Sequence, residues 1–280
     1  MWLTPMDIGF PVWPIGIIRK AHLARIEHFR SPNLWRSGQL IHGCHDKAPR
    51  RCLDQTGAAE SVSPVGLIAI NRSPLPVRTA RLTSNTRSMR EYDLIADWYP
   101  TDHSRTFGVA EALAVAALLP AHSRILDVGC GNGVPITEAL VDAGHRVVGL
   151  DSSAGMLARF RVNLPGTPVV RGDARCCPFA DGCFDGAISW GMIFHLPPAG
   201  QAAVFASVSR ALKPGAPFLF TATEIEGVGN TGVTGTMNGV TFHYYAVPRY
   251  QNLIDAHGLV LENIHDDPGV STYYLTRKSR

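Results

Sequence analysis

The chain lacks the features of a membrane protein and those of a secreted protein. None of its apolar stretches reaches the roughly 20 uninterrupted residues that a membrane-spanning helix needs, because Asp7, Pro11 and Pro14 interrupt the apolar N-terminus early. The same segment lacks the basic start and the small-residue cleavage site of a secretory signal. We therefore expect a soluble, cytoplasmic protein that has no membrane partner.

The chain also lacks a cysteine framework. Its six cysteines include no C-x-x-C pair and no regular spacing, which indicates reduced thiols and not structural disulfides in a chain of this size. One group of possible metal ligands lies near the N-terminus, but its spacing fits no regular zinc finger: His42, Cys44, His45 and Cys52. We therefore expect no metal site.

Most of the chain lacks a net positive charge. Residues 1–88 carry 12 lysines and arginines against 5 acidic residues, whereas residues 89–280 carry 14 against 18. The net charge of +3 thus combines +7 in the first part with −4 in the second. Electrostatics gives no reason for the main part to follow a phosphate backbone, so we do not expect a nucleic-acid partner.

The first 88 residues show no readable order of helices and strands. They contain eight prolines, scattered arginines and only short periodic runs, so we expect a poorly ordered extension. An acid-poor arm of this kind would also suit an RNA contact or a targeting role. The pattern changes near Met89, and we hypothesise that Met89 is the functional start of a folded domain over residues 89–280.

Residues 89–280 alternate between strand and helix patterns. After helices at 92–99 and 107–119, strands are expected at 124–128, 146–150, 168–171, 184–190, 217–222, 259–264 and 272–275, with helices at 135–143, 154–162, 200–212 and 248–257. This alternation predicts a parallel sheet with crossover helices. The Gly- and Thr-rich stretch at 224–243 is long for a connector and suits a mobile lid.

The first predicted strand runs into a turn in which Gly129, Gly131 and Gly133 alternate with other residues. Glycine permits a tight turn from strand to helix and lets the backbone approach a ligand, and the free N–H groups of the helix favour an anionic group. Ligands bind at the carboxyl ends of the strands in such sheets. The turn is therefore a candidate binding site, although glycine turns also serve purely steric purposes.

Acidic residues end the next two strands. Asp151 lies 20 positions after Gly131, where a carboxylate can accept hydrogen bonds from both hydroxyls of a ribose. Asp173 ends the third strand, at a position that could meet an exocyclic amine of a purine. Each acid taken singly could be a helix cap or a solvated turn residue. Three successive strands that end in polar residues favour a nucleotide-like ligand.

The sequence resembles the class I S-adenosylmethionine-dependent methyltransferases, in particular the small bacterial type. The resemblance covers nearly everything from Tyr92 onwards, and its ordered motifs are ILDVGCGNG at 125–133, VVGLDSS at 147–153, GDA at 172–174, PFAD at 178–181, FD at 184–185 and LKPG at 212–215. It implies an α/β fold: a Rossmann-like, doubly wound, mostly parallel seven-stranded sheet with helices on both faces and a C-terminal antiparallel strand. It also implies S-adenosyl-L-methionine as the cofactor.

The resemblance further implies where the cofactor lies. The loop at 127–133 would hold the methionine moiety, Asp151 the ribose and Asp173 the adenine, and the edge at 189–190 would face the methyl acceptor. The implied cofactor-binding residues are Tyr99, Asp127, Gly129, Gly131, Asn132, Gly133, Asp151, Ser152, Met156, Gly172, Asp173, Ala174, Ser189 and Trp190.

A dinucleotide-dependent dehydrogenase is the main competing interpretation, because it also combines a glycine turn with an acid after the second strand. Two details count against it. The spacing here is G-x-G-x-G and not G-x-G-x-x-G. In addition, Asp127 precedes the first glycine by two positions, where a carboxylate suits an ammonium group better than a pyrophosphate.

The candidate acceptor-side residues follow the fourth strand and the Gly- and Thr-rich stretch. His195 is the best candidate for a catalytic base, although a histidine there could equally orient a loop through a backbone hydrogen bond. His243, Tyr244 and Tyr245 would line the acceptor pocket together with His195, or pack as an aromatic strand end on the core.

The segment at 190–197 contains neither an Asn-Pro-Pro-Tyr-like element nor a Pro-Cys nucleophile, which argues against methylation of amino groups or pyrimidine carbons on nucleic-acid bases. The same segment resembles that of small bacterial-type methyltransferases with small-molecule acceptors, and this resemblance implies an S-adenosylmethionine-dependent methyltransferase that acts on a small molecule. The alternative is a non-catalytic cofactor-binding or RNA-associated protein that retains the same fold.

Overall fold

A computed structural model describes residues 87–99, 106–222, 233–266 and 272–280. The predicted N-terminal extension, apart from its last two positions, therefore lies outside the described residues. None of the helices in the described ranges combines the length and the apolar character that crossing a membrane would require.

Seven strands form one sheet in the spatial order β3-β2-β1-β4-β5-β9-β8. Strands β1 to β5 run parallel to their neighbours, whereas β9 runs antiparallel to both β5 and β8. The strands are β1 (Arg124–Val128), β2 (Arg146–Asp151), β3 (Val169–Arg171), β4 (Gly186–Ser189), β5 (Pro217–Ala222), β8 (Leu259–Asp266) and β9 (Thr272–Lys278). The predicted Rossmann-like, mostly parallel sheet with an antiparallel C-terminal strand is confirmed.

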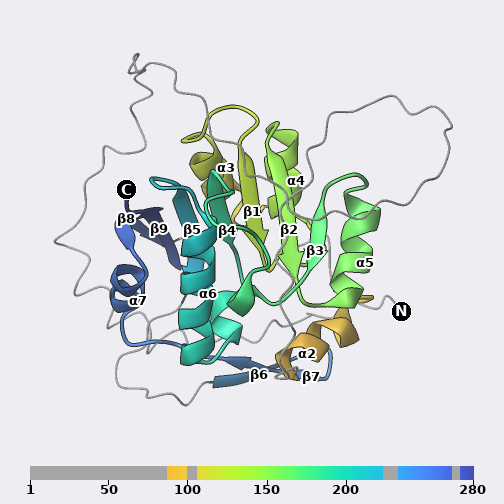
Figure 1. The fold of residues 1–280 in the computed structure, drawn as a ribbon. Helices are drawn as coiled ribbons and strands as arrows, with labels where there is room; N and C mark the ends of the chain where they lie inside the picture. The colour runs from red at the N-terminus through yellow and green to blue at the C-terminus, as the bar shows by residue number, and fades with distance from the viewer. Residues whose placement is uncertain (1–86, 100–105, 223–232, 267–271) are drawn as a thin grey trace, which may run out of the picture. The chain divides into compact units, whose positions relative to one another are not determined.

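Helices cover both faces of this sheet (Figure 1). Helices α3 (Val109–Ala116) and α4 (Ile136–Asp142) pack on one face, and α6 (Pro198–Ala211) and α7 (Tyr250–Ala256) pack on the other. Helix α5 (Ala154–Asn163) contacts β2 and β3, and α2 (Arg87–Ile95) contacts α5. The crossover helices thus leave the carboxyl ends of the parallel strands free to form a site.

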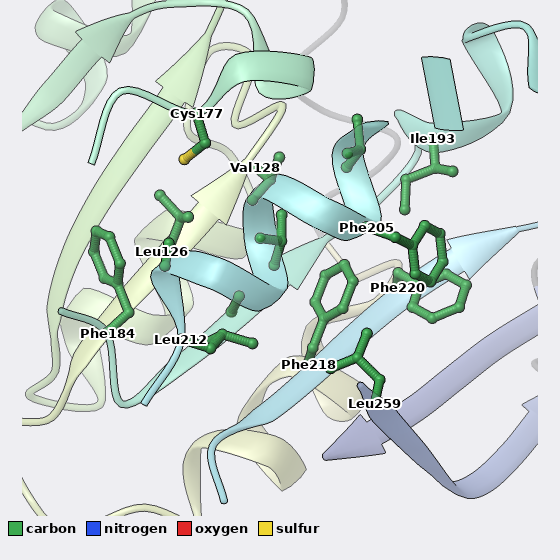
Figure 2. Close-up of a cluster of buried hydrophobic side chains, with 14 of the residues drawn as sticks. Leu126, Val128, Cys177, Phe184, Ile193, Phe205, Leu212, Phe218, Phe220 and Leu259 are labelled. Carbon is green, nitrogen blue, oxygen red and sulfur yellow. The ribbon is translucent and has the colours of Figure 1, made fainter. Parts of the chain in front are cut away.

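Strand β1 contributes to the cores on both faces, because successive side chains of a strand point in opposite directions. Leu126 and Val128 belong to the cluster that also holds Phe205 and its aromatic neighbours (Figure 2). Ile125 belongs to the opposite cluster, with residues of α3 and α4. Each such buried side chain stabilises the fold by about 1.5 to 3 kcal/mol. Burial on both faces therefore holds the end of β1 rigidly in place.

The Gly- and Thr-rich stretch that was expected to be a mobile lid contains regular structure. Residues 223–232 lie outside the described part, but β6 (Val233–Met237) and β7 (Val240–Tyr244) pair as an antiparallel hairpin. Asn238 and Gly239 connect the two strands with φ angles of 47° and 78°, a geometry that Asn-Gly pairs favour in two-residue hairpin turns. This dipeptide is the sequence signal that the lid expectation overlooked.

Candidate functional site

A cleft opens at the carboxyl ends of β1, β2, β3 and β4. It contains about 1070 Å³ of empty space, a volume that includes the solvent at its open mouth. The predicted cofactor-binding residues that line it are Tyr99, Asp127, Gly129, Gly131, Asn132, Asp151, Ser152, Met156, Gly172, Asp173, Ala174 and Trp190. Residues from five separate segments of the sequence thus meet in one place.

The turn between β1 and α4 lies against the segment that follows β4. Gly129 has a φ angle of 76°, which residues with a side chain rarely adopt. A Cβ atom on Gly129 would lie 2.5 Å from Cγ of Met192. Its N–H group donates to the carbonyl of Leu150 at 2.7 Å. Glycine is therefore required here both for the backbone conformation and for the close approach of Met192.

Asp127 is a buried carboxyl group at the floor of the cleft, with only 3% of its surface exposed. The hydroxyl of Thr137 on α4 donates to its Oδ2 atom at 2.5 Å. Burial raises the pKa of Asp127 to about 7, a shift that the hydrogen bond from Thr137 opposes and the nearby Asp151 increases. Near neutral pH this carboxyl populates both forms, and a cation beside it would favour the ionised one.

Asp151 connects the glycine turn to the start of α5. Its two oxygens accept hydrogen bonds from the N–H groups of Gly131, at 2.9 Å, and Ser153, at 2.8 Å. Burial raises the pKa of Asp151, although these backbone hydrogen bonds oppose the shift. A carboxylate has about four lone-pair sites, so both oxygens keep acceptor capacity for a ligand.

Asp173 is paired with a residue that the sequence analysis did not assign to the site. The side chain of Arg175 donates to Oδ2 of Asp173 from Nε at 2.9 Å and from Nη2 at 2.6 Å. The backbone N–H of Arg175 donates to Oδ1 at 2.9 Å. A purine amine that contacts Asp173 would therefore have to share this carboxylate with Arg175. The position of Arg175, two residues after Asp173, was the signal that the sequence offered.

Helix α2 is fastened to the loop that carries Asp151. The Oδ1 atom of Asp93 accepts hydrogen bonds from the hydroxyl of Ser153 at 2.6 Å and from the N–H of Gly155 at 2.8 Å. Ser153 also caps α5, because its Oγ atom accepts from the N–H of Met156 at 3.1 Å. Sequence reasoning missed Asp93, which lies 60 positions before Ser153.

His195 lies on the short 3-10 helix η3 (Ile193–His195) and lines the cleft. Its Nε2 atom is 3.0 Å from the hydroxyl of Tyr92 on α2. Burial lowers the pKa of His195 to about 4, and hydrogen bonds with the backbone of His243 and Gly191 oppose this shift only in part. Burial also raises the pKa of Tyr92. The Tyr92 hydroxyl and the His195 ring are therefore hydrogen-bonded as two neutral groups.

Two of the residues predicted to bind the cofactor do not line the cleft. A Cβ atom on Gly133 would lie 2.6 Å from Cδ1 of Leu164, so this glycine allows α4 to pack near the end of α5. Ser189 is fully buried, and its hydroxyl donates to the carbonyl of Val128 at 3.0 Å. Gly133 supports the site by allowing close packing near the end of α5, and Ser189 supports it by joining β4 to β1.

The three aromatic residues predicted from the end of the Gly- and Thr-rich stretch lie behind the cleft wall and not on it. His243 is exposed on β7. Tyr244 packs on His195 with ring centroids 4.9 Å apart, and the N–H of Tyr245 donates to the carbonyl of Phe194 at 2.6 Å. Tyr244 and Tyr245 thus contact the segment that carries His195, and only His195 of the predicted acceptor set lines the cleft.

Within the ranges that the structure describes, no group of three or more His, Cys, Asp or Glu side chains is arranged to hold a metal ion. The four possible ligands near the N-terminus lie outside these ranges. The expectation that the chain needs no metal therefore stays a prediction.

Known proteins resemble the chain in sequence and in fold. Residues 125–215 match the family model of the methyltransferase domain. The chain is 37% identical over 130 residues to trans-aconitate 2-methyltransferase of Acidovorax ebreus, covering 42% of this chain and 47% of that protein. It is 37% identical over 95 residues to an uncharacterised methyltransferase of Synechocystis, covering 34% and 44%.

A solved structure shares the fold at a lower sequence identity. It is the 1,6-didemethyltoxoflavin N1-methyltransferase of Burkholderia thailandensis with bound S-adenosylhomocysteine, with a TM-score of 0.51 and 20% identity over 73% of this chain and 94% of that one. The chain spans about half the length of the curated relatives it matches. Within residues 125–215 the chain therefore matches a methyltransferase domain, and its described fold is shared with the solved structure.

Proposed function

We propose that the protein transfers a methyl group from S-adenosylmethionine to a small-molecule acceptor. The observation that carries this proposal is a row of acids in one cleft. Asp173 follows β3, Asp151 ends β2 and Asp127 is the next-to-last residue of β1, and these three strands are neighbours in the sheet. β4 is the next strand, so a ligand lying along the row would end beside the segment that follows β4.

The row matches the parts of the cofactor in order. We assign the adenine to the end of β3, the ribose to Asp151 and the methionine to the turn after β1. The ammonium group would then lie near Asp127, whose buried carboxyl accepts a hydrogen bond from Thr137. In this orientation the residues of the segment 190–196 that line the cleft would lie at the methionine end of the cofactor.

The sulfonium of the bound cofactor supplies an activated methyl group, whose bond to sulfur breaks as its bond to the acceptor forms. The protein's own contribution is to align the acceptor with that bond and to exclude water. We assign this role to Trp190, Met192 and His195, which follow β4 and line the cleft. His195 as a base stays a prediction, because a histidine with a pKa near 4 accepts protons poorly at neutral pH.

A small-molecule acceptor agrees with the relatives, one of which is named for its action on trans-aconitate. Calorimetry should show that S-adenosylmethionine and S-adenosylhomocysteine bind to the same single site. Transfer of a labelled methyl group into compounds of a metabolite extract should then follow. Binding without any transfer would favour the non-catalytic or RNA-associated alternative, and absence of binding would contradict the proposal.

We also propose that residues 89–280 form the folded unit and that residues 1–88 are dispensable for it. Helix α2 begins at Arg87, so a chain that starts at Met89 loses only two helical positions. We expect this shortened chain to unfold cooperatively and to bind S-adenosylhomocysteine within about twofold of the full chain, because terminal extensions seldom support a core. A shortened chain that fails to fold or to bind would refute dispensability.

A further inference from the structure

The acceptor end of the cleft differs in chemistry from the cofactor end. Among the described residues, the charged ones that line the cleft are Asp127, Asp151, Asp173 and Arg175, and all lie at or near the carboxyl ends of β1, β2 or β3. The lining contributed by α2, by the residues after it and by the segment after β4 consists of uncharged side chains, among them Tyr92, Tyr99, Trp190, Met192, His195 and Leu196.

Aromatic rings from three segments join at this end. Tyr92 on α2 meets the ring of His195 on η3 edge to face, with centroids 5.5 Å apart. It also meets Phe242 on β7 at 5.1 Å, again edge to face. Tyr99 lies 6.1 Å from Tyr92. Figure 1 shows α2 and the hairpin of β6 and β7 together beyond the carboxyl ends of the strands.

Hydrogen bonds prevent these rings from rearranging freely. The Tyr92 hydroxyl is bound to His195, and Asp93, the next residue on α2, is bound to Ser153 and Gly155. Rings that are held edge to face leave defined flat surfaces for a further ring, since aromatic pairs prefer offset-stacked or edge-to-face contacts. The shape is therefore set before a ligand enters.

We propose that the end of the cleft lined by the rings of Tyr92, Tyr99, Trp190 and His195 is the acceptor subsite. It takes an uncharged, planar aromatic acceptor, an inference that rests on the proposed function. A charged acceptor would lose its hydration at a wall that offers no opposite charge among the described lining residues. His195 is neutral there because its pKa is low. Glu91 is close enough to affect Tyr92 and Tyr244 electrostatically, but it does not line the cleft.

Four probes of one shape and different charge test the inference. They are 2-naphthol, the anion 2-naphthoate, the cation 2-naphthylmethylammonium and the saturated, non-planar decahydro-2-naphthol. Each is titrated by calorimetry into the full-length protein saturated with S-adenosylhomocysteine, at about pH 7, where the naphthol hydroxyl keeps its proton as a phenol does. We expect 2-naphthol to bind about tenfold more tightly than either ion, because an unpaired buried charge is costly.

The other outcomes overturn the inference in distinguishable ways. Equal binding of 2-naphthoate or of the ammonium probe would contradict the uncharged acceptor, and equal binding of decahydro-2-naphthol would contradict the planar aromatic one. If S-adenosylhomocysteine binds and none of the probes does, the acceptor inference fails while the proposed function stands. If S-adenosylhomocysteine itself fails to bind, both fail.

Substitutions of Tyr92 test whether 2-naphthol binds at this end of the cleft. Tyr92→Leu removes one ring and should weaken 2-naphthol binding by about fivefold, whereas Tyr92→Phe keeps the ring and should weaken it less. Trp98→Leu is the matched control, because Trp98 follows the same helix, is 45% exposed and does not line the cleft. Binding of S-adenosylhomocysteine shows that each variant is folded. A loss for Trp98→Leu equal to that for Tyr92→Leu would place the probe elsewhere.

Discussion

Replacement of Asp151 by alanine is expected to weaken the binding of S-adenosylmethionine by about 1 to 3 kcal/mol, the usual cost of leaving buried hydrogen-bonding groups without a partner. The ribose hydroxyls would lose their acceptor. The N–H groups of Gly131 and Ser153 would lose theirs too, since both donate to this carboxylate in the folded chain. Titration calorimetry measures the change directly.

Two further variants separate these contributions. Asp151→Asn keeps the shape and one acceptor oxygen, so its affinity should lie between those of the wild type and Asp151→Ala. Asp173→Asn should cost less than Asp151→Ala, because Arg175 already occupies the carboxylate of Asp173. Unchanged affinity in Asp151→Ala would show that the ribose lies elsewhere in the cleft.

Cofactor affinity is expected to rise about tenfold between about pH 6 and about pH 8, since only the ionised fraction of Asp127 can pair with the ammonium group. The direction follows from the raised pKa, which burial brings to about 7. Below that pH most of the carboxyl groups are protonated, and above it most are charged. Titrations with S-adenosylhomocysteine at a series of pH values would record this dependence.

Asp127→Asn is the matched control, because the amide keeps the size of the side chain and cannot ionise. The ligand's own titration is the same with both proteins, so the ratio of their affinities isolates Asp127. This ratio should change about tenfold over the range if the ammonium pairs with the carboxylate. A ratio that stays constant with pH would exclude Asp127 from the ammonium site.

The same group should affect the stability of the cofactor-free protein in the opposite direction. A carboxyl group whose pKa is raised by folding binds its proton more tightly in the folded state than in the unfolded one. The contribution of Asp127 to the free energy of unfolding should therefore fall as the pH rises from about 4 to about 7. Thermal unfolding of the wild type and of Asp127→Asn would reveal this contribution as a difference between the two proteins.

Much of the fold could be predicted because it depends on local patterns. Strand β1 and strand β5 have the predicted bounds, since a buried parallel strand reads as a short apolar run between turn residues. Gly129 marks the turn, because its positive φ is a local requirement of the backbone. The hairpin of β6 and β7 was open to prediction by the same reasoning, through Asn238 and Gly239.

The acceptor side could not be predicted in the same way. Tyr92 and His195 are 103 positions apart in the chain, yet their side chains are hydrogen-bonded. Asp93 reaches Ser153 because α2 packs against α5, and a Cβ atom on Gly155 would lie 2.7 Å from Cβ of Ala96. Pairings of this kind depend on how whole helices dock, which no periodicity within either segment records.

By itself, the sequence determined the parallel sheet, the glycine turn and the row of three acids, because periodicity, backbone freedom and the spacing of strand ends are properties of short segments. Only the tertiary structure decided that Arg175 occupies the carboxylate of Asp173, and that His195 is buried, neutral and hydrogen-bonded to Tyr92 within an aromatic wall. The physical reason is that burial and side-chain pairing, which set charge and shape at a site, arise only when distant segments pack together.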